Sequence, residues 1–224
     1  MDIALSLVIV LASYLLGSIP IAYLTGKALR GIDIRQVGSA TAGASNVYQS
    51  VARWAVVPVG LLQIGQGMAG VALAKLFDQP LGVQVLAGLA AVGGAAWPLF
   101  LGFRGGRGIG ASIGFLLILT PATLVVFVVI SLVGVALRSI PLAVGLGIAA
   151  SPLSALVFEG AGPVAAGCLG LAAIIFLKRA LANDRRLPQG PDRREVIVNR
   201  LLFDRDIRDR DEWVRRGLDG HARR

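Results

Sequence analysis

Two short glycine-rich loops contain most of the residues in this sequence that could do chemistry. The first, residues 31–47, is small and rich in hydroxyl groups, with Ser39, Thr41, Gly43, Ser45 and Asn46 as its candidate binding residues. Consecutive backbone amides with few side chains in the way form an anion cradle. An ordinary connector with a helix cap at Ser45 or Asn46 has the same composition. The loop therefore indicates either a phosphate site or a capped connector.

The second loop places two arginines among glycines, directly before a long apolar run. Its candidate binding residues are Arg104, Gly105, Gly106, Arg107 and Gly108. A glycine-rich turn that opens a helix presents free N–H groups, and an arginine fork binds phosphate oxygens. The loop is neither a Walker A motif nor a dinucleotide fingerprint. Alone it could be a plain basic loop, but two such loops on one side predict a site for a substrate with two phosphate-bearing parts.

The composition places these loops in a membrane protein. The chain has 224 residues, of which 55% are hydrophobic and 16% charged, and its mean hydropathy is +0.74. An ordinary soluble domain is excluded. Of the net charge of +9, residues 182–224, where twelve arginines alternate with nine acidic residues, contribute +3, and residues 1–181 contribute +6. This interleaving of opposite charges disfavours nucleic-acid binding. The single cysteine, Cys168, is expected in the apolar core.

Seven apolar segments are separated by charges or by Pro/Gly breaks. They are residues 3–25, 54–74, 81–101, 140–158 and 163–177, together with the two parts of residues 109–138. A spanning helix needs about 20 mainly apolar residues. Residues 109–138 are too many for one span, and Thr120-Pro121 divides them because proline breaks a helix. We predict an all-α, polytopic membrane protein with seven transmembrane helices in residues 1–181 and a charged cytoplasmic tail in residues 182–224.

The loop charges predict the orientation of these spans. Lysine and arginine favour cytoplasmic loops. Such residues lie in the first, third and fifth connections and after the last span: Lys27, Arg30, Arg35, Arg53, Arg104, Arg107, Arg138, Lys178 and Arg179. The even-numbered connections carry Asp78 and Glu159, with Lys75 as the exception. The N-terminus is therefore expected outside and the C-terminus inside, with both glycine loops on the cytoplasmic side.

Glycine is unusually frequent, at 29 of 224 residues. Helices in lipid gain little hydrophobic energy by touching, so small residues that let backbones approach favour their packing. We expect close-packing faces at residues 65–70 and 87–96.

The loops and the residues around them resemble a known family. The resemblance lies in Gly17-Ser18-Ile19-Pro20-Ile21-Ala22-Tyr23-Leu24, Asp33-Ile34-Arg35-Gln36-Val37-Gly38-Ser39, Gly43-Ala44-Ser45-Asn46-Val47, Gly94, Pro98 and residues 102–108. The sequence resembles the acyl-phosphate-dependent glycerol-3-phosphate acyltransferases, the PlsY family, whose second motif usually reads Gly-Phe-Lys-Gly-Gly-Lys-Gly. The resemblance covers about residues 3–181. The family's seven-helix, N-out and C-in topology agrees with the segments and charges above.

The resemblance implies a reaction at the cytoplasmic face of a bacterial plasma membrane. A fatty acyl group would pass from acyl phosphate to the primary hydroxyl of glycerol-3-phosphate, giving lysophosphatidic acid and phosphate, without metal or coenzyme. Ser39, Gly43, Ser45 and Asn46 match the first, phosphate-cradling motif, and residues 104–108 match the second. Ser39, Asn46 and Arg107 are the catalytic candidates. Because acyl phosphate is already activated, positioning and charge stabilisation could supply most of the catalysis.

The sequence departs from the family pattern at several positions. Ala40-Thr41 replaces Gly-Asn, Gln49 replaces an arginine, Gln63 and Gln66 align with Asp and Lys, and Ala95 aligns with a histidine. The third motif, His-Arg-Glu-Asn-Ile then Arg-Leu-Leu, fits Lys178-Arg179 by position and residues 193–197 with 200–202 by letters. His221, the only histidine, is not expected to be catalytic.

These departures leave other functions open. One is a non-catalytic relative that binds a phosphorylated lipid or acyl phosphate, or regulates a partner. A small transporter is disfavoured, because the apolar segments hold almost no ionisable residues. The tail is expected to be a solvated face with local ion pairs; alternatively, Leu201, Leu202, Phe203, Trp213 and Val214 form an amphipathic helix on the inner leaflet.

Overall fold

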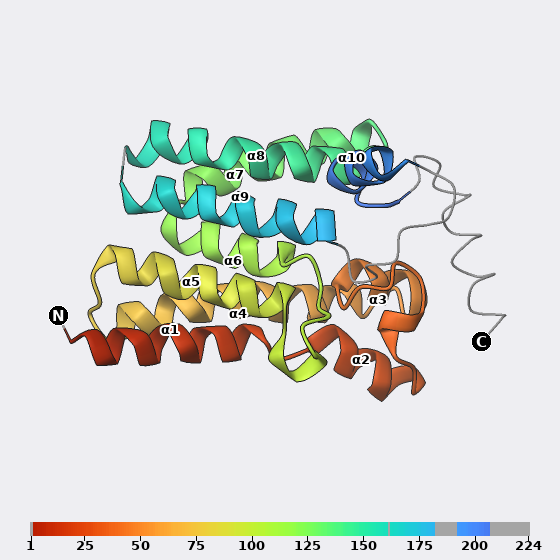
Figure 1. The fold of residues 1–224 in the computed structure, drawn as a ribbon, viewed down its shortest axis with the longest axis horizontal. Helices are drawn as coiled ribbons and strands as arrows, with labels where there is room; N and C mark the ends of the chain where they lie inside the picture. Colours follow the sequence, from red (N-terminus) through yellow and green to blue (C-terminus); the bar gives the residue numbers. More distant parts are fainter. Residues whose placement is uncertain (1, 161, 182–191, 207–224) are drawn as a thin grey trace.

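The fold is a helical bundle (Figure 1). A computed structural model describes residues 2–160, 162–181 and 192–206, and every regular element in these ranges is helical. The α-helices are α1 (Ile3–Gly17), α2 (Ile21–Arg30), α3 (Ala44–Ser50), α4 (Val56–Leu76), α5 (Leu81–Ala96), α6 (Ile109–Leu119), α7 (Pro121–Ala136), α8 (Ile140–Glu159), α9 (Pro163–Leu181) and α10 (Arg193–Phe203), with 3-10 turns η1 (Ile34–Gln36) and η2 (Leu99–Leu101). The all-α prediction is confirmed.

Among the residues that the structure describes, five segments are long and apolar enough to cross a membrane. They are Ile3–Arg30, Val56–Leu76, Leu81–Leu101, Ile140–Glu159 and Pro163–Leu181. The helices α6 and α7 are apolar but shorter. The predicted break between them is confirmed, since α6 ends at Leu119 and α7 begins at Pro121. The chain is therefore a multi-pass membrane protein.

The first apolar segment, predicted over residues 3–25, is found as a candidate span over Ile3–Arg30, but it contains a break that was not predicted. Helix α1 ends at Gly17 and α2 begins at Ile21, because Pro20 lacks the N–H that would continue the helix. The break leaves carbonyl groups without helical partners. The amide of Gln66 on α4 donates to the carbonyls of Leu16 (2.9 Å), Gly17 (3.2 Å) and Ile19 (2.9 Å). Gln66 thus stabilises the break that turns the chain toward the first polar loop.

The helices form two groups (Figure 1). In the first, α1 packs on α5, and α4 packs on both α5 and α6; in the second, α8 packs between α7 and α9. Contacts of α9 with α5 join the groups, and Phe115 and Cys168 are fully buried in the largest apolar cluster. Cys168 lies in the core, as predicted.

Glycines set the closest helix contacts. A Cβ at Gly67 on α4 would overlap the carbonyl of Ala111 on α6, and one at Gly114 on α6 would overlap the carbonyl of Ile64 on α4. The predicted close-packing faces are confirmed here and at Gly88, where a Cβ would lie 2.6 Å from Phe115. Because α6 begins at the second glycine loop, this contact also positions that loop.

One end of the bundle carries the polar elements. Helices α2, α3 and α10 gather at the end opposite the N-terminus (Figure 1). Helix α10 packs against α8 and α9. The sequence hypothesis of an amphipathic tail helix on the inner leaflet falls partly on residues 213 and 214, which lie outside the described residues, as does His221. The described part of the tail packs on the bundle through α10.

Candidate active site

Asn46 organises the first polar loop. Its side chain is fully buried, and its Nδ2 donates to the carbonyls of Ile34 (2.8 Å), Val37 (3.0 Å) and Thr41 (2.9 Å). Its Oδ1 accepts from the backbone N–H of Ser39 and the hydroxyl of Ser50. The amide therefore has its hydrogen-bonding capacity filled by the protein. Asn46 thus holds the loop in shape, and it is not among the residues that line the cavity described below.

Replacing Asn46 with aspartate is expected to destabilise the protein strongly. The variant removes three donated hydrogen bonds and turns a buried carboxylate toward three carbonyl oxygens, so we expect a loss of about 3 kcal/mol or more of unfolding free energy. Thermal melting of the purified protein in detergent measures it. Ser50→Ala, which removes one hydrogen bond to the same amide, is the matched control, and we expect it to lower the unfolding free energy by about 1 kcal/mol. Equal melting temperatures for Asn46→Asp and the wild type would contradict this role.

An arginine ties the first loop to η2, the turn directly before the second loop. Arg35 forms a two-pronged pair with Asp33, with Nη2 2.8 Å from Oδ2 and Nε 3.0 Å from Oδ1. Its Nη1 also donates to the Leu101 carbonyl at 3.1 Å. The hydrogen bond from Arg35 lowers the pKa of Asp33 below its ordinary value, and the same bond raises the pKa of Arg35. Both groups therefore stay charged, and the bridge from the first loop to η2 persists at neutral pH.

The second loop presents backbone donors at the start of α6. Gly108, at the N-cap position of α6, has a φ of +79° and no side chain that could cap the helix. The N–H groups in the first turn of α6 therefore have no side-chain partner at the N-cap and favour an anion. Gly106 lies against the first loop, since a Cβ on it would be 2.9 Å from the Ala42 carbonyl. The absence of a side chain at Gly106 is what lets the two loops meet.

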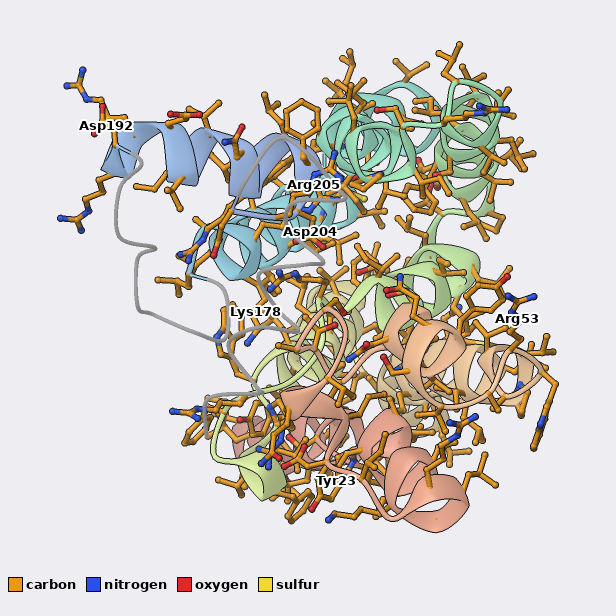
Figure 2. The ribbon with its side chains drawn as sticks, turned by 90° about the vertical axis from the view of Figure 1, so that its right-hand side faces the viewer. Tyr23, Arg53, Lys178, Asp192, Asp204 and Arg205 are labelled. Atoms are coloured by element: carbon orange, nitrogen blue, oxygen red, sulfur yellow. The ribbon has the colours of Figure 1, made fainter. Side chains whose placement is uncertain are left out.

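Arg107 connects the second loop to the C-terminal part of the chain. Its Nε lies 2.6 Å from Oδ1 of Asp204, and its Nη1 donates to the Lys178 carbonyl at 3.4 Å. Figure 2 looks onto this end of the molecule and shows Lys178, Asp204 and Arg205 in the same region, near α10, whereas Arg53 lies well to one side.

The two placements of the third motif meet in space. Lys178 and Arg179 are buried at the end of α9, and Arg200 is buried in α10. Arg179 donates to the Leu201 carbonyl at 2.9 Å, and Arg200 donates to the Ala180 carbonyl at 3.2 Å. Arg200 also pairs with Asp206. Both candidate segments therefore contribute to one structure beside the glycine loops.

These elements enclose a cavity of about 730 Å³, a volume typical of small-molecule sites. The residues of its wall that carry polar groups or belong to the polar loops include Ser39, Thr41, Gly43, Ser45, Gln49, Gln63, Gly106, Arg107, Gly108, Arg138, Ser139, Arg179, Asp204 and Arg205. Its apolar wall includes Ile64, Ile109, Ile113, Ile140, Val144 and Phe203. The cavity thus suits a ligand with both charged and hydrocarbon parts.

The cavity gathers most, but not all, of the predicted binding residues. Ser39, Thr41, Gly43, Ser45, Gly106, Arg107 and Gly108 line it. Asn46 lies beneath its wall, Arg104 is exposed outside it, and Gly105 packs near Pro98, where a Cβ would be 2.6 Å from the Ala95 carbonyl. These three residues are placed to shape or flank the site.

Sequence reasoning missed the C-terminal wall of the cavity. Arg138 served only as a marker of membrane orientation, and Asp204 and Arg205 were assigned to a solvated tail, yet all three line the cavity. The alternation of arginine and aspartate in the tail sequence was the available signal. It did not indicate which residues elsewhere in the fold these side chains would contact.

The fold and the cavity define a class of protein. An all-helical, multi-pass membrane protein with a basic, glycine-framed cavity beside an apolar wall is suited to a reaction or binding event on phosphate-bearing lipid precursors.

Comparisons with known proteins specify the family. The model of the glycerol-3-phosphate acyltransferase family matches residues 7–190. Glycerol-3-phosphate acyltransferase 4 of Dehalococcoides mccartyi (strain CBDB1) is 34% identical over 221 residues, covering 96% of this chain and 95% of the relative. The glycerol-3-phosphate acyltransferase of Synechococcus sp. (strain CC9902) is 40% identical over 195 residues, covering 84% and 94%.

Two solved structures of PlsY, an integral membrane glycerol 3-phosphate acyltransferase, have similar folds. Its glycerol 3-phosphate form has a TM-score of 0.72 at 28% identity, covering 78% of this chain and 88% of that one. Its lysophosphatidic acid form has a TM-score of 0.72 at 26% identity, covering 93% and 97%. The chain belongs to the glycerol-3-phosphate acyltransferase family, and it is a membrane acyltransferase.

Proposed function

We propose that this enzyme uses acyl phosphate as donor and glycerol-3-phosphate as acceptor. The observation that carries the proposal is that an uncapped helix start, Arg107 and a hydroxyl-rich loop face an apolar wall within one cavity. Phosphate groups suit the first wall, and a fatty acyl chain suits the second. The relatives, which are named glycerol-3-phosphate acyltransferases, and the PlsY structures in glycerol 3-phosphate and lysophosphatidic acid forms support the assignment of the acceptor.

The transfer needs one bond to form and one to break. The primary hydroxyl oxygen of glycerol-3-phosphate attacks the acyl carbonyl carbon and forms the ester bond. The bond between that carbon and the bridging phosphate oxygen breaks, and phosphate leaves with the electron pair. The leaving phosphate takes the hydroxyl proton, so no protein base is required. The protein's task is to position two anions and stabilise their charge.

The site residues divide this task. Gly106, Gly108 and the first turn of α6 offer backbone N–H groups to the acceptor phosphate, and Arg107 offers its guanidinium. Ser39, Thr41, Gly43 and Ser45 face the same space from the first loop. The hydroxyls of Ser39 and Thr41 are 2.9 Å apart, so they act as a pair. Asn46 positions this loop, and Ile113 and Val144 flank the acyl chain.

A bacterial plasma membrane with the cavity toward the cytoplasm is the setting we propose. In this arrangement residues 1–181 form a seven-span domain, in which α6 and α7 are two short spans, and residues 182–224 form a cytoplasmic tail. The basic residues in the first, third and fifth connections support this orientation. The N-terminus is then outside.

Cysteine labelling tests the orientation. In a Cys168→Ala background, Asp2→Cys is expected to react with a membrane-impermeant maleimide on intact spheroplasts. Arg53→Cys is expected to react only after permeabilisation. The reverse pattern would refute the proposed topology.

The donor is tested by comparing activated acyl groups. Purified enzyme in lipid nanodiscs is supplied with glycerol-3-phosphate and either acyl phosphate or acyl-coenzyme A of the same chain length. We expect lysophosphatidic acid from acyl phosphate alone, because a cavity of about 730 Å³ suits a compact phosphate beside the acyl chain. Faster product formation from acyl-coenzyme A would refute the proposed donor.

A further inference from the structure

The cavity contains a second group of cations, separate from the glycine loop. Arg138 comes from the α7–α8 connection, Arg179 from the end of α9, and Arg205 from the segment after α10. Asp204 is the only acidic residue among the described residues that line the cavity, and it is paired with Arg107. This wall therefore carries an excess of positive charge, which favours a further anion.

Arg179 is the buried member of this group. It is only 2% exposed, and its guanidinium donates to two backbone carbonyls, that of Leu201 at 2.9 Å and that of Pro141 at 3.0 Å. Within the described ranges no carboxylate lies within ion-pair distance of it, and its Nε has no hydrogen-bond partner. The carboxylate of Asp204 interacts with it electrostatically but is paired with Arg107. A buried charge without a close counterion is costly, and a bound anion would supply one.

The fold makes room for this guanidinium. A Cβ at Gly145 on α8 would lie 2.7 Å from Nη1 of Arg179, so a larger residue would crowd it. The bond to Pro141 places Arg179 at the start of α8, where Ile140 and Val144 form part of the apolar wall. The cation thus lies at the junction of the charged and hydrocarbon parts of the cavity.

The second cation group is also next to the first anion site. Arg107 donates to the carbonyl of Lys178, and Arg179 is the next residue in the chain. Two anions held by these groups would be neighbours, as transfer between them requires.

We infer that Arg138, Arg179 and Arg205 bind the phosphate of the acyl donor, while Arg107 and the start of α6 bind that of the acceptor. This assignment rests on the proposed function. The donor is the substrate with a phosphate joined directly to a hydrocarbon chain, which matches the position of these arginines beside the apolar wall. They also stabilise the charge of the phosphate as it leaves.

Separate Michaelis constants for the two substrates test the assignment. Arg138→Gln changes an exposed side chain and is expected to raise KM for acyl phosphate roughly three- to tenfold, with KM for glycerol-3-phosphate unchanged. Arg179→Gln is expected to raise KM for acyl phosphate roughly ten- to a hundredfold. Arg179→Lys is expected to recover part of the lost affinity for acyl phosphate. Arg53→Gln, a cation outside the cavity, is the matched control and is expected to leave both constants unchanged.

The outcomes separate this assignment from the proposed function. If the wild type turns over acyl phosphate but Arg138→Gln raises KM for glycerol-3-phosphate alone, or both constants equally, the assignment is overturned while the function stands. If the wild type forms no product from acyl phosphate, the proposed function itself fails. Should Arg179→Gln not fold, Arg138→Gln alone decides between these results.

Discussion

Replacing Arg107 with alanine is expected to lower kcat/KM for glycerol-3-phosphate by about 10²–10³-fold. The side chain is the one arginine of the second loop that lines the cavity, and it lies beside the uncapped start of α6. Its loss removes a charge-assisted donor to phosphate and also the ion pair with Asp204, which anchors the segment after α10. Arg107→Lys is expected to recover part of the activity, because it keeps the charge but loses the planar fork.

Steady-state kinetics of the purified variants measure this effect, with thermal melting as a check on folding. Arg104→Ala is the matched comparison: the residue belongs to the same loop but is exposed and outside the cavity. Its effect is expected to be less than about threefold, in the range of exposed charges. Equal losses from the two alanine variants would contradict the assignment of Arg107 as the phosphate-binding arginine.

Gly67→Ala is expected to prevent stable folding or to lower the unfolding free energy by about 3 kcal/mol or more. The new methyl group would overlap the Ala111 carbonyl, which belongs to the α6 backbone and cannot rotate away. The helices α4 and α6 would have to separate, and the start of α6 would move with them. Activity is therefore expected to fall together with stability.

Gly65→Ala is the control for this helix contact. Gly65 lies on the same helix, two residues away, and a Cβ there would meet nothing within 4 Å. Because alanine favours helix over glycine, we expect an unchanged or slightly higher melting temperature. A stable, fully active Gly67→Ala protein would show that α4 and α6 are not in backbone contact.

The sequence predicted those parts of the fold that depend on local chemistry. Hydropathy located the apolar helices, and Pro121 marked the turn between α6 and α7. The break after Gly17 was missed because the residues on both sides are apolar, and its stability depends on Gln66, about fifty positions further along the chain. Hydropathy averaged over neighbouring residues does not register a contact between residues so far apart in the chain.

In the candidate site, too, the sequence predicted the features that depend on neighbouring residues and missed those that depend on distant contacts. The two glycine loops were predicted from their small residues, but the sequence left open whether Asn46 binds substrate or backbone, because an amide is equally suited to both. The positions of the surrounding carbonyls, which the sequence does not give, show that its side chain holds the backbone of the loop. The pairing of Arg107 with Asp204 joins residues 97 positions apart, and no periodicity in an alternating Arg/Asp tail specifies which aspartate meets which arginine.

The central claim, acyl transfer within this cavity, is tested most directly by measuring both products in one reaction. Purified enzyme in lipid nanodiscs receives acyl phosphate and glycerol-3-phosphate, and lysophosphatidic acid and inorganic phosphate are quantified together. We predict equal amounts of the two products, and loss of both in a Ser39→Ala, Arg107→Ala double variant. Phosphate release without lysophosphatidic acid, or equal yields from the wild type and the double variant, would contradict the claim.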